Sequence, residues 1–214
     1  MGGHRVVIVI PALNESATIF KVVKNTLPYG LPIVVDDGST DATATLAGQA
    51  GALVISHEAN LGYDQALNSG FSKASDLGAE VIITLDADGQ HNPDLIKKFI
   101  DQIDAGFDCV VGNRNKKQRI GESIFALYTN YFYGIGDPLC GMKAYTISAY
   151  NALGYFDSYQ SVGTQLLIFL AKRKCALGQV NFRTYDRVGL PRFGTGIKAN
   201  YKIIRALILA CFRI

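Results

Sequence analysis

The chain has 214 residues, of which 49% are apolar and 18% charged, and its formal net charge is +3. This length suits one domain that buries roughly 70% of its unfolded surface, and the apolar fraction excludes a disordered chain. Four cysteines without a Cys-x-x-Cys pair argue against a zinc ribbon or disulfide framework and are typical of a reducing cytoplasm. No apolar run approaches the roughly 20 residues needed to span a bilayer.

The charge is divided unevenly along the chain. Residues 1–110 carry a balance of −8, whereas residues 111–214 carry +11. An acidic half followed by a basic half indicates two different ligand environments on one fold, unless the charge is merely uneven over the surface. Because no linker-like run separates the halves, we expect one domain over residues 1–214.

Short apolar runs alternate with helical patterns in the first half. The predicted strands are Val6–Ile10, Ile33–Val35, Leu53–Ser56, Val81–Leu85 and Cys109–Val111. The predicted helices are Glu15–Thr26, Asp41–Ala50, Asp64–Ser75 and Asp94–Ala105, with Asn14, Ser39 or Thr40, and Asn92 as candidate caps. Repeated β-α units predict an α/β fold with a mostly parallel, Rossmann-like sheet flanked by helices. Such sheets bind ligands at the carboxyl ends of their strands.

The second half is less regular. It predicts a helix from Gly121 or Glu122 to Tyr133, a short strand through Met142–Tyr145, a helix at about Thr164–Lys174, a strand near Gln179–Tyr185 and a helix at Ile197–Phe212. In the last helix Lys198, Lys202 and Arg205 form a basic stripe beside a broad apolar surface. This helix either packs like any other or lies at a membrane, attracted by about 1 kcal/mol per basic residue.

Two carboxylates leave the fourth predicted strand. Asp86 and Asp88 can face one cation while Ala87 points away, and Gln90 can add an amide oxygen. Such oxygen ligands suit Mg²⁺ or Mn²⁺. The alternative is an Asp-rich turn that caps the next helix, but acidic clusters at neighbouring strand ends favour the metal site.

Two further segments indicate a nucleotide site. A carboxylate after the second strand can accept hydrogen bonds from a nucleobase or ribose, so we expect Asp37 to face a ligand and Ser39 or Asp41 to cap the next helix. Gly62 would let an anion approach the start of the third helix, although an ordinary glycine turn fits equally well.

Several motifs together resemble a known family. Its members are inverting family 2 glycosyltransferases with the GT-A, or nucleotide-diphospho-sugar transferase, fold. The branch with dolichol-phosphate mannosyltransferases and bacterial polyprenyl-phosphate glycosyltransferases is the most similar. The motifs are Pro11–Glu15, Asp36–Asp41, Asn60-Leu61-Gly62, Asp86–His91, Gly112-Asn113-Arg114, Asp137–Tyr145, Arg187 and Arg192–Gly194, and they cover nearly the whole chain.

The resemblance implies a donor site in the first half. A nucleotide-sugar, either a UDP- or a GDP-sugar, would be held by Pro11, Glu15, Asp37 and Asp86, with backbone near Gly62. A Mg²⁺ or Mn²⁺ ion on Asp86, Asp88 and Gln90 would neutralise the departing diphosphate, which makes Asp88 catalytic. The sugar would move with inversion to a polyprenyl-phosphate, dolichyl-phosphate or glycan acceptor, in the manner of enzymes of cell-envelope polysaccharide.

The basic half would supply the acceptor site. The resemblance implies that Arg114, Arg119 and Ser123 clamp a lipid phosphate, for which guanidinium forks are suited. A phosphate needs no general base, whereas a sugar hydroxyl does, and Asp137 is then the catalytic candidate. A solvated basic loop and a plain turn before Pro138 are the alternatives. We expect a cytoplasmic enzyme, peripheral on the inner membrane face, without a nucleic-acid partner.

The chain departs from the family at one helix start, and two other functions compete. Many relatives are rich in glycine where this chain has Tyr63-Asp64-Gln65. A non-catalytic module that binds a nucleotide-sugar or lipid would have lost a metal carboxylate, and both are present. A haloacid-dehalogenase-type phosphatase carries a similar D-x-D-G-T motif, but after its first strand. Here three β-α units precede the motif, and Gln90 replaces the Thr.

Overall fold

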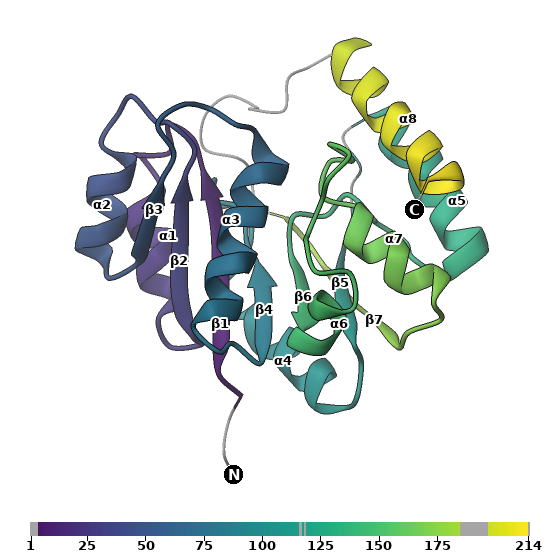
Figure 1. The fold of residues 1–214 in the computed structure, drawn as a ribbon, viewed down its shortest axis with the longest axis horizontal. Helices are drawn as coiled ribbons and strands as arrows, with labels where there is room; N and C mark the ends of the chain where they lie inside the picture. The colour runs from purple at the N-terminus through teal and green to yellow at the C-terminus, as the bar shows by residue number, and fades with distance from the viewer. Residues whose placement is uncertain (1–3, 116, 118, 185–196, 214) are drawn as a thin grey trace.

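The computed structural model describes residues 4–115, 117, 119–184 and 197–213 (Figure 1). The strands are β1 (Val6–Ala12), β2 (Leu31–Asp36), β3 (Leu53–Ser56), β4 (Val81–Thr84), β5 (Cys109–Arg114), β6 (Lys143–Thr146) and β7 (Leu177–Phe182). The helices are α1 (Ile19–Thr26), α2 (Thr43–Ala50), α3 (Tyr63–Asp76), α4 (Leu95–Asp104), α5 (Ile120–Tyr133), α6 (Ile147–Asn151), α7 (Gln165–Lys172) and α8 (Ile197–Phe212). Each predicted element is present, and α6 was not predicted.

One seven-stranded sheet takes strands from both halves of the chain. Its order is β3-β2-β1-β4-β6-β5-β7, and β6 runs antiparallel to both of its neighbours while the other pairs are parallel. The prediction of a mostly parallel sheet flanked by helices is therefore confirmed. Because Thr84 pairs with Lys143, the insertion of β6 places second-half residues beside the end of β4.

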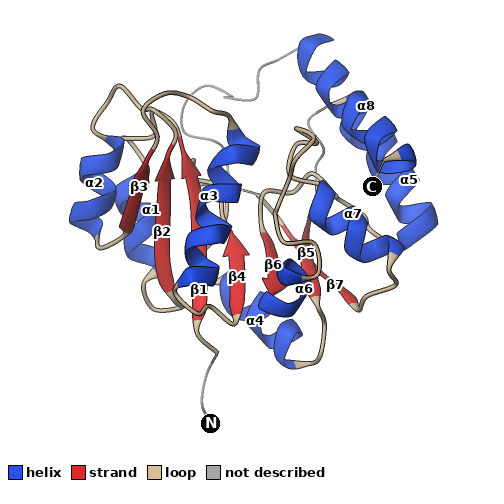
Figure 2. Ribbon diagram, viewed as in Figure 1, coloured by secondary structure: helices blue, strands red, loops and turns tan. Residues whose placement is uncertain are grey.

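Helices cover both faces of the sheet (Figure 2). Ile8 and Ile10 of β1 pack in a core with α1, α2 and α4, whereas Val7 and Val9 pack in a second core with α3, α6 and α7. This alternation explains the continuous apolar runs in the sequence, since a strand buried on both faces needs no polar positions. A third, smaller core joins α5, α7 and α8.

The loops after β1 and β2 differ in part from their predicted role as helix caps. Helix α1 begins at Ile19, and Asn14 instead bridges the loops: its N–H donates to Ser39 Oγ at 2.8 Å, and its Oδ1 accepts the N–H of Thr40 at 2.8 Å. At the start of α2, Asp41 Oδ1 accepts the N–H of Thr43 at 3.0 Å, so Asp41 has the capping role predicted for it. Asn14 adopts a left-handed φ of 52°, which Asn tolerates better than most residues. Asn14, Ser39 and Thr40 therefore join two strand ends, whereas Asp41 caps a helix.

Helix α8 packs along α5 (Figure 1). Ile203, Ala206 and Ala210 fill the seam, and the N–H of Gly121 donates to Asn200 Oδ1 at 3.0 Å. A Cβ at position 121 would lie 3.0 Å from that oxygen, so glycine permits the close approach. Among the described residues, no helix is long and apolar enough to cross a membrane.

Candidate active site

A cleft of about 1080 Å³ opens at the carboxyl ends of the strands. It is bounded by the ends of β1, β2 and β4, the start of α3, the loop between α6 and α7, and one side of α8. The predicted site residues that line it are Pro11, Glu15, Asp37, Gly62, Asp86, Asp88, Gln90, Arg114 and Arg119. Ser123 and Asp137 are not among its lining residues.

The end of β4 presents the predicted metal ligands. Ala87 is buried in the core while Asp86 and Asp88 line the cleft, and Asp88 Oδ1 accepts the N–H of Gln90 at 3.0 Å. A Cβ built on Gly141 would lie 2.0 Å from Asp86 Oδ2, so only glycine leaves room for this carboxylate.

This donor set fits a hard divalent cation. No group of three His, Cys, Asp or Glu side chains converges to hold a metal within the described ranges. Two carboxylates and one amide oxygen would therefore supply only part of the coordination, as is common for Mg²⁺, which keeps waters and binds substrate phosphates.

Asp37 organises the loop that precedes α3. Its Oδ1 accepts the N–H of Leu61 at 2.9 Å, its Oδ2 accepts that of Gly62 at 2.8 Å, and Oδ1 also lies 2.7 Å from His57 Nδ1. His57 Nε2 in turn lies 2.9 Å from Ser69 Oγ. The sequence analysis missed His57, although it follows a strand directly, which is the signal that singled out the acidic clusters.

Gly62 is required by its backbone conformation. Its φ is 97°, and nothing lies within 4 Å of a Cβ built there. A residue with a side chain would therefore have a strained backbone at this position, but its Cβ would meet no steric clash. Nearby, Glu15 is buried at the cleft, and its N–H donates to Thr43 Oγ1 at 2.8 Å. The two loops are thereby held together at the predicted nucleotide end.

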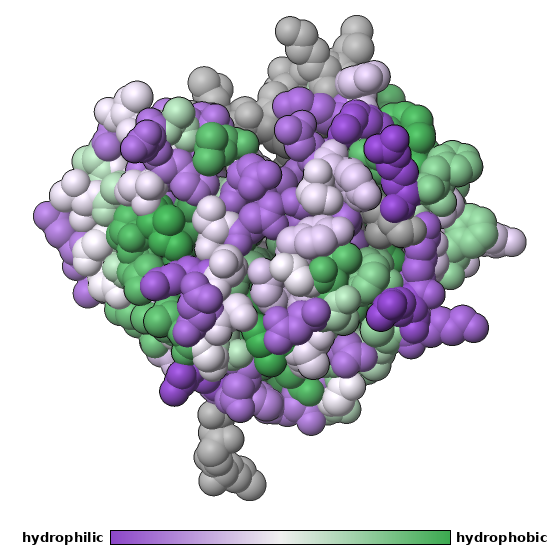
Figure 3. All heavy atoms as spheres, viewed as in Figure 1, coloured by the Kyte–Doolittle hydropathy of each residue, from purple (hydrophilic) through white to green (hydrophobic). Residues whose placement is uncertain are grey.

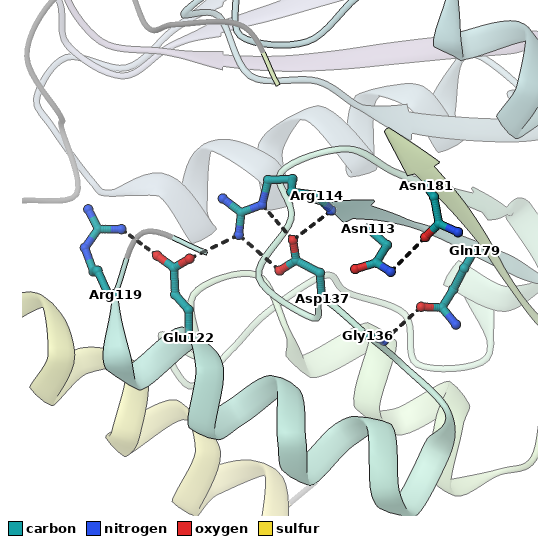
Figure 4. A network of polar contacts seen from close by, with 8 residues as sticks. All are labelled: Asn113, Arg114, Arg119, Glu122, Gly136, Asp137, Gln179 and Asn181. Atoms are coloured by element: carbon teal, nitrogen blue, oxygen red, sulfur yellow. Dashed lines mark hydrogen bonds and ion pairs between the residues drawn. The ribbon is translucent and has the colours of Figure 1, made fainter. Parts of the chain in front are cut away.

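A charged network forms the wall where β5 meets α5 (Figure 4). Arg114 binds Asp137 through two parallel bonds, from Nε to Oδ2 at 2.7 Å and from Nη2 to Oδ1 at 3.0 Å. Glu122 Oε2 lies 3.4 Å from Arg114 Nη2, and its Oε1 lies 2.7 Å from Arg119 Nη1. Burial would lower the pKa of Arg114, but the hydrogen bonds to Asp137 and the nearby negative charges raise it above its ordinary value.

Two predicted acceptor residues lie outside the cleft. Asp137 is only 1% exposed, and both of its oxygens bind Arg114. Ser123 is exposed on α5, because the inward-facing position of this turn is taken by Glu122. Glu122 was not predicted as a site residue, since a lone acid among basic residues gives no signal in sequence.

Two residues of the predicted basic stripe of α8 face the cleft. Lys202 and Arg205 line it, and Arg205 Nη1 donates to the carbonyls of Tyr159 at 2.9 Å and Gln160 at 3.1 Å. The side chain of Lys198 and the motif residues Arg187 and Arg192–Gly194 lie outside the described part of the chain.

Comparisons with known proteins indicate the family of this chain. Residues 7–163 match the model of Glycosyl transferase family 2. The UDP-N-acetylglucosamine–dolichyl-phosphate N-acetylglucosaminyltransferase of Methanococcus voltae is 29% identical, covering 98% of this chain and 97% of that protein. The polyprenol monophosphomannose synthase of Mycolicibacterium smegmatis is 27% identical, covering 71% and 68%.

A solved structure shows the same architecture. Glucosyl-3-phosphoglycerate synthase from Mycobacterium tuberculosis, in complex with Mn²⁺, UDP and glucosyl-3-phosphoglycerate, matches with a TM-score of 0.79 and 25% identity, covering 98% of this chain and 80% of that chain. The fold is that of the GT-A glycosyltransferases. The chain belongs to glycosyltransferase family 2, and this membership sets aside the phosphatase and the non-catalytic module.

Proposed function

We propose that this glycosyltransferase moves a sugar, with inversion, from a UDP- or GDP-sugar to a polyprenyl-phosphate at a membrane surface. The observation that carries the proposal is one cleft lined both by Asp86, Asp88 and Gln90 and by basic side chains of β5, α5 and α8. Carboxylates suit a cation bound to a diphosphate, whereas the basic wall suits a phosphate acceptor.

The donor side supplies binding and leaving-group stabilisation. Asp86, Asp88 and Gln90 would hold the divalent ion, which stabilises negative charge on the departing nucleoside diphosphate. The loop fixed by Asp37 would hold the nucleoside beside Gly62. Manganese and UDP in the solved relative support this assignment, although that enzyme shares only 25% identity.

The acceptor side favours a phosphate over a sugar hydroxyl. Glu122 fixes Arg114 and Arg119 before any ligand binds, so less ordering is needed on binding. Asp137 is committed to Arg114 and is poorly placed to take a proton from a hydroxyl group. An ionised phosphate oxygen attacks the anomeric carbon without giving up a proton, and the bond to the diphosphate breaks on the opposite face.

An apolar surface beside the cleft fits a lipid acceptor. Ile120, Ile124, Leu127 and Tyr131 are exposed along one stripe of α5, at spacings of four, three and four residues. Tyr201, Ile208 and Phe212 are exposed on neighbouring α8. Figure 3 shows hydrophobic residues beside hydrophilic ones over these helices. Together with Lys202 and Arg205, this surface suits an anionic membrane.

The test is release of nucleoside diphosphate from a panel of UDP- and GDP-sugars on vesicles that contain undecaprenyl or dolichyl phosphate. We expect release that requires Mn²⁺ or Mg²⁺ and the lipid phosphate, and that falls in Asp88→Asn to the level seen with excess EDTA. Asp101→Asn, an exposed carboxylate on α4, should leave release unchanged.

Two results would contradict the proposal. Full turnover in excess EDTA would show that the reaction needs no divalent metal ion. Equal turnover on a soluble acceptor such as 3-phosphoglycerate would show that the acceptor need not be a lipid. The second result would favour an acceptor like that of the solved relative, whose complex contains a phosphorylated three-carbon acid.

A further inference from the structure

Two charged side chains in the cleft wall have no part in the function proposed so far. Asp64 lies in the first turn of α3. Lys143 is the first residue of β6. Both line the cleft that holds Asp86 and Asp88, so a bound donor would pass close to them.

The Asp64 carboxylate faces the backbone N–H groups of Val162 and Gly163, but one of its oxygens lacks a hydrogen bond of normal geometry. Its Oδ2 accepts the N–H of Val162 at 3.2 Å. Its Oδ1 is shielded from solvent and has no hydrogen-bond partner among the residues that the structure describes. Burial and the charge of Asp157 raise the pKa of Asp64 to about 7. A shielded oxygen without a partner costs free energy unless a ligand donates a hydrogen bond to it.

The Lys143 ammonium is also incompletely satisfied. Lys143 is 3% exposed, and its Nζ donates to the Gly163 carbonyl at 3.1 Å, which uses one of its N–H donors. No ion pair joins it to a carboxylate within the described part of the chain. Burial lowers the pKa of Lys143. Because a buried ammonium without a close counter-ion is costly, its presence at the cleft points to a ligand.

One loop ties the two side chains together. Val162 and Gly163 are consecutive, so Asp64 and Lys143 bind neighbouring peptide groups between α6 and α7. Gln160 and Val162 also line the cleft, and their φ values of 54° and 58° are left-handed, which such residues rarely adopt. Strain of this kind persists only where the surroundings impose it, as they do at functional sites.

We propose that Asp64 and Lys143 recognise the hydroxyl groups of the transferred sugar. Asp64 Oδ1 accepts a hydrogen bond from one hydroxyl, and Lys143 Nζ donates to a hydroxyl oxygen. A hydroxyl group can do both, whereas a phosphate at the same place would be repelled by Asp64. The inference rests on the proposed function and adds a determinant of donor choice.

Calorimetry of nucleotide binding in MnCl₂ tests the inference without the acceptor. The probes are UDP, GDP, UDP-glucose, UDP-N-acetylglucosamine and GDP-mannose, and the variants are Asp64→Asn and Lys143→Met. Each variant should weaken binding of the preferred nucleotide-sugar about 10- to 100-fold, the usual loss for a hydrogen bond to a charged group. Asp64→Asn should not weaken binding of the matching nucleoside diphosphate, and Gln65→Ala, at the next position on the cleft, should leave both affinities unchanged.

Deoxy-sugar analogues identify the contact. The analogue that lacks the contacted hydroxyl should bind wild-type protein weakly, yet bind Asp64→Asn as well as the complete sugar does. The single oxygen of the asparagine stays on the N–H of Val162, so the two changes remove the same bond. If Asp64→Asn does not fold, Lys143→Met carries the test. Its melting temperature should equal or exceed that of the wild type, since a buried charge is removed.

The outcomes separate this inference from the function beneath it. Unchanged nucleotide-sugar affinity in both variants overturns the sugar contact and leaves the proposed function standing. Equal weakening of nucleotide-sugar and diphosphate in both variants shows that the two residues only support the loop, which also overturns it. A wild-type protein that binds no nucleotide overturns both proposals.

Discussion

The substitution Asp137→Asn separates the two roles open to this carboxylate. In one role Asp137 is the buried partner of Arg114, and in the other it accepts a proton from a sugar hydroxyl. Asparagine keeps the shape of the side chain and can still accept one hydrogen bond. It removes both the negative charge and the second parallel bond to the guanidinium group.

The structure sets the expected size of the effect. Asp137 is 1% exposed and the Arg114 side chain 13%, so the substitution would leave a largely buried, uncompensated cation. Removal of one partner from a buried pair costs about 3–5 kcal/mol, and Glu122 at 3.4 Å still offsets part of the charge, which favours about 3 kcal/mol. For a chain of this length, that loss lowers the melting temperature by about 6–12 °C.

Thermal unfolding followed by circular dichroism measures the loss, and nucleoside diphosphate release on polyprenyl-phosphate vesicles measures the activity. We expect a clear fall in melting temperature and residual turnover below the new melting point. A shift in melting temperature of less than about 2 °C corresponds to a loss of stability below about 1 kcal/mol. A variant that shows such a small shift and has no turnover would refute the reasoning. It would show that Asp137 acts in the reaction itself and not only as the buried partner of Arg114.

Three further predictions follow from the site and the surface. Gly141→Ala should abolish Mn²⁺-dependent nucleotide binding in calorimetry, because its Cβ would displace the Asp86 carboxylate; unchanged affinity would contradict this geometry. Asp64 holds its proton more tightly folded than unfolded, so wild-type stability in urea should fall as pH rises from about 4 to about 7, by less than about 1.4 kcal/mol per unit, and Asp64→Asn should lose this dependence. Leu127→Glu should release the protein from anionic vesicles in a sedimentation assay, whereas Phe20→Glu, also exposed but on α1, should not; equal binding of both variants would exclude the α5 surface.

Most of the fold follows from local patterns in the sequence. Apolar runs buried on both faces predict β1, β2 and β4, and the predicted bounds of α8 agree with the observed helix. The antiparallel direction of β6 could not be predicted, because it depends on pairing with strands far away in the chain. The start of α1 was misplaced for a similar reason, since Asn14 bonds to Ser39 and Thr40 rather than to its own helix.

The residues of the candidate site could also be predicted only in part from the sequence. Asp86, Asp88 and Gln90 are close in sequence, so a single strand end predicts that they share the cleft. Glu122 joins Arg119, three residues away, to Arg114, eight residues away, and His57 contacts Asp37, twenty residues away; only the folded chain shows the two longer-range contacts. Because Asp137 and Ser123 do not line the cleft, variants of the residues that line it should be assayed before variants of these two.

The central position of β6 has a consequence for how the chain folds during synthesis. Strand β4 leaves the ribosome about sixty residues before its partner β6, and β5 has no neighbour until β6 and β7 follow. A nascent chain of 110 residues therefore exposes an unpaired edge of β4 next to Asp86, where another chain could pair. An exchange between relatives at residue 110 should therefore disturb the sheet, because the strand that pairs with β4 is encoded after it. A chimera that carries β6 with its own β4 should fold, whereas one that separates them should aggregate.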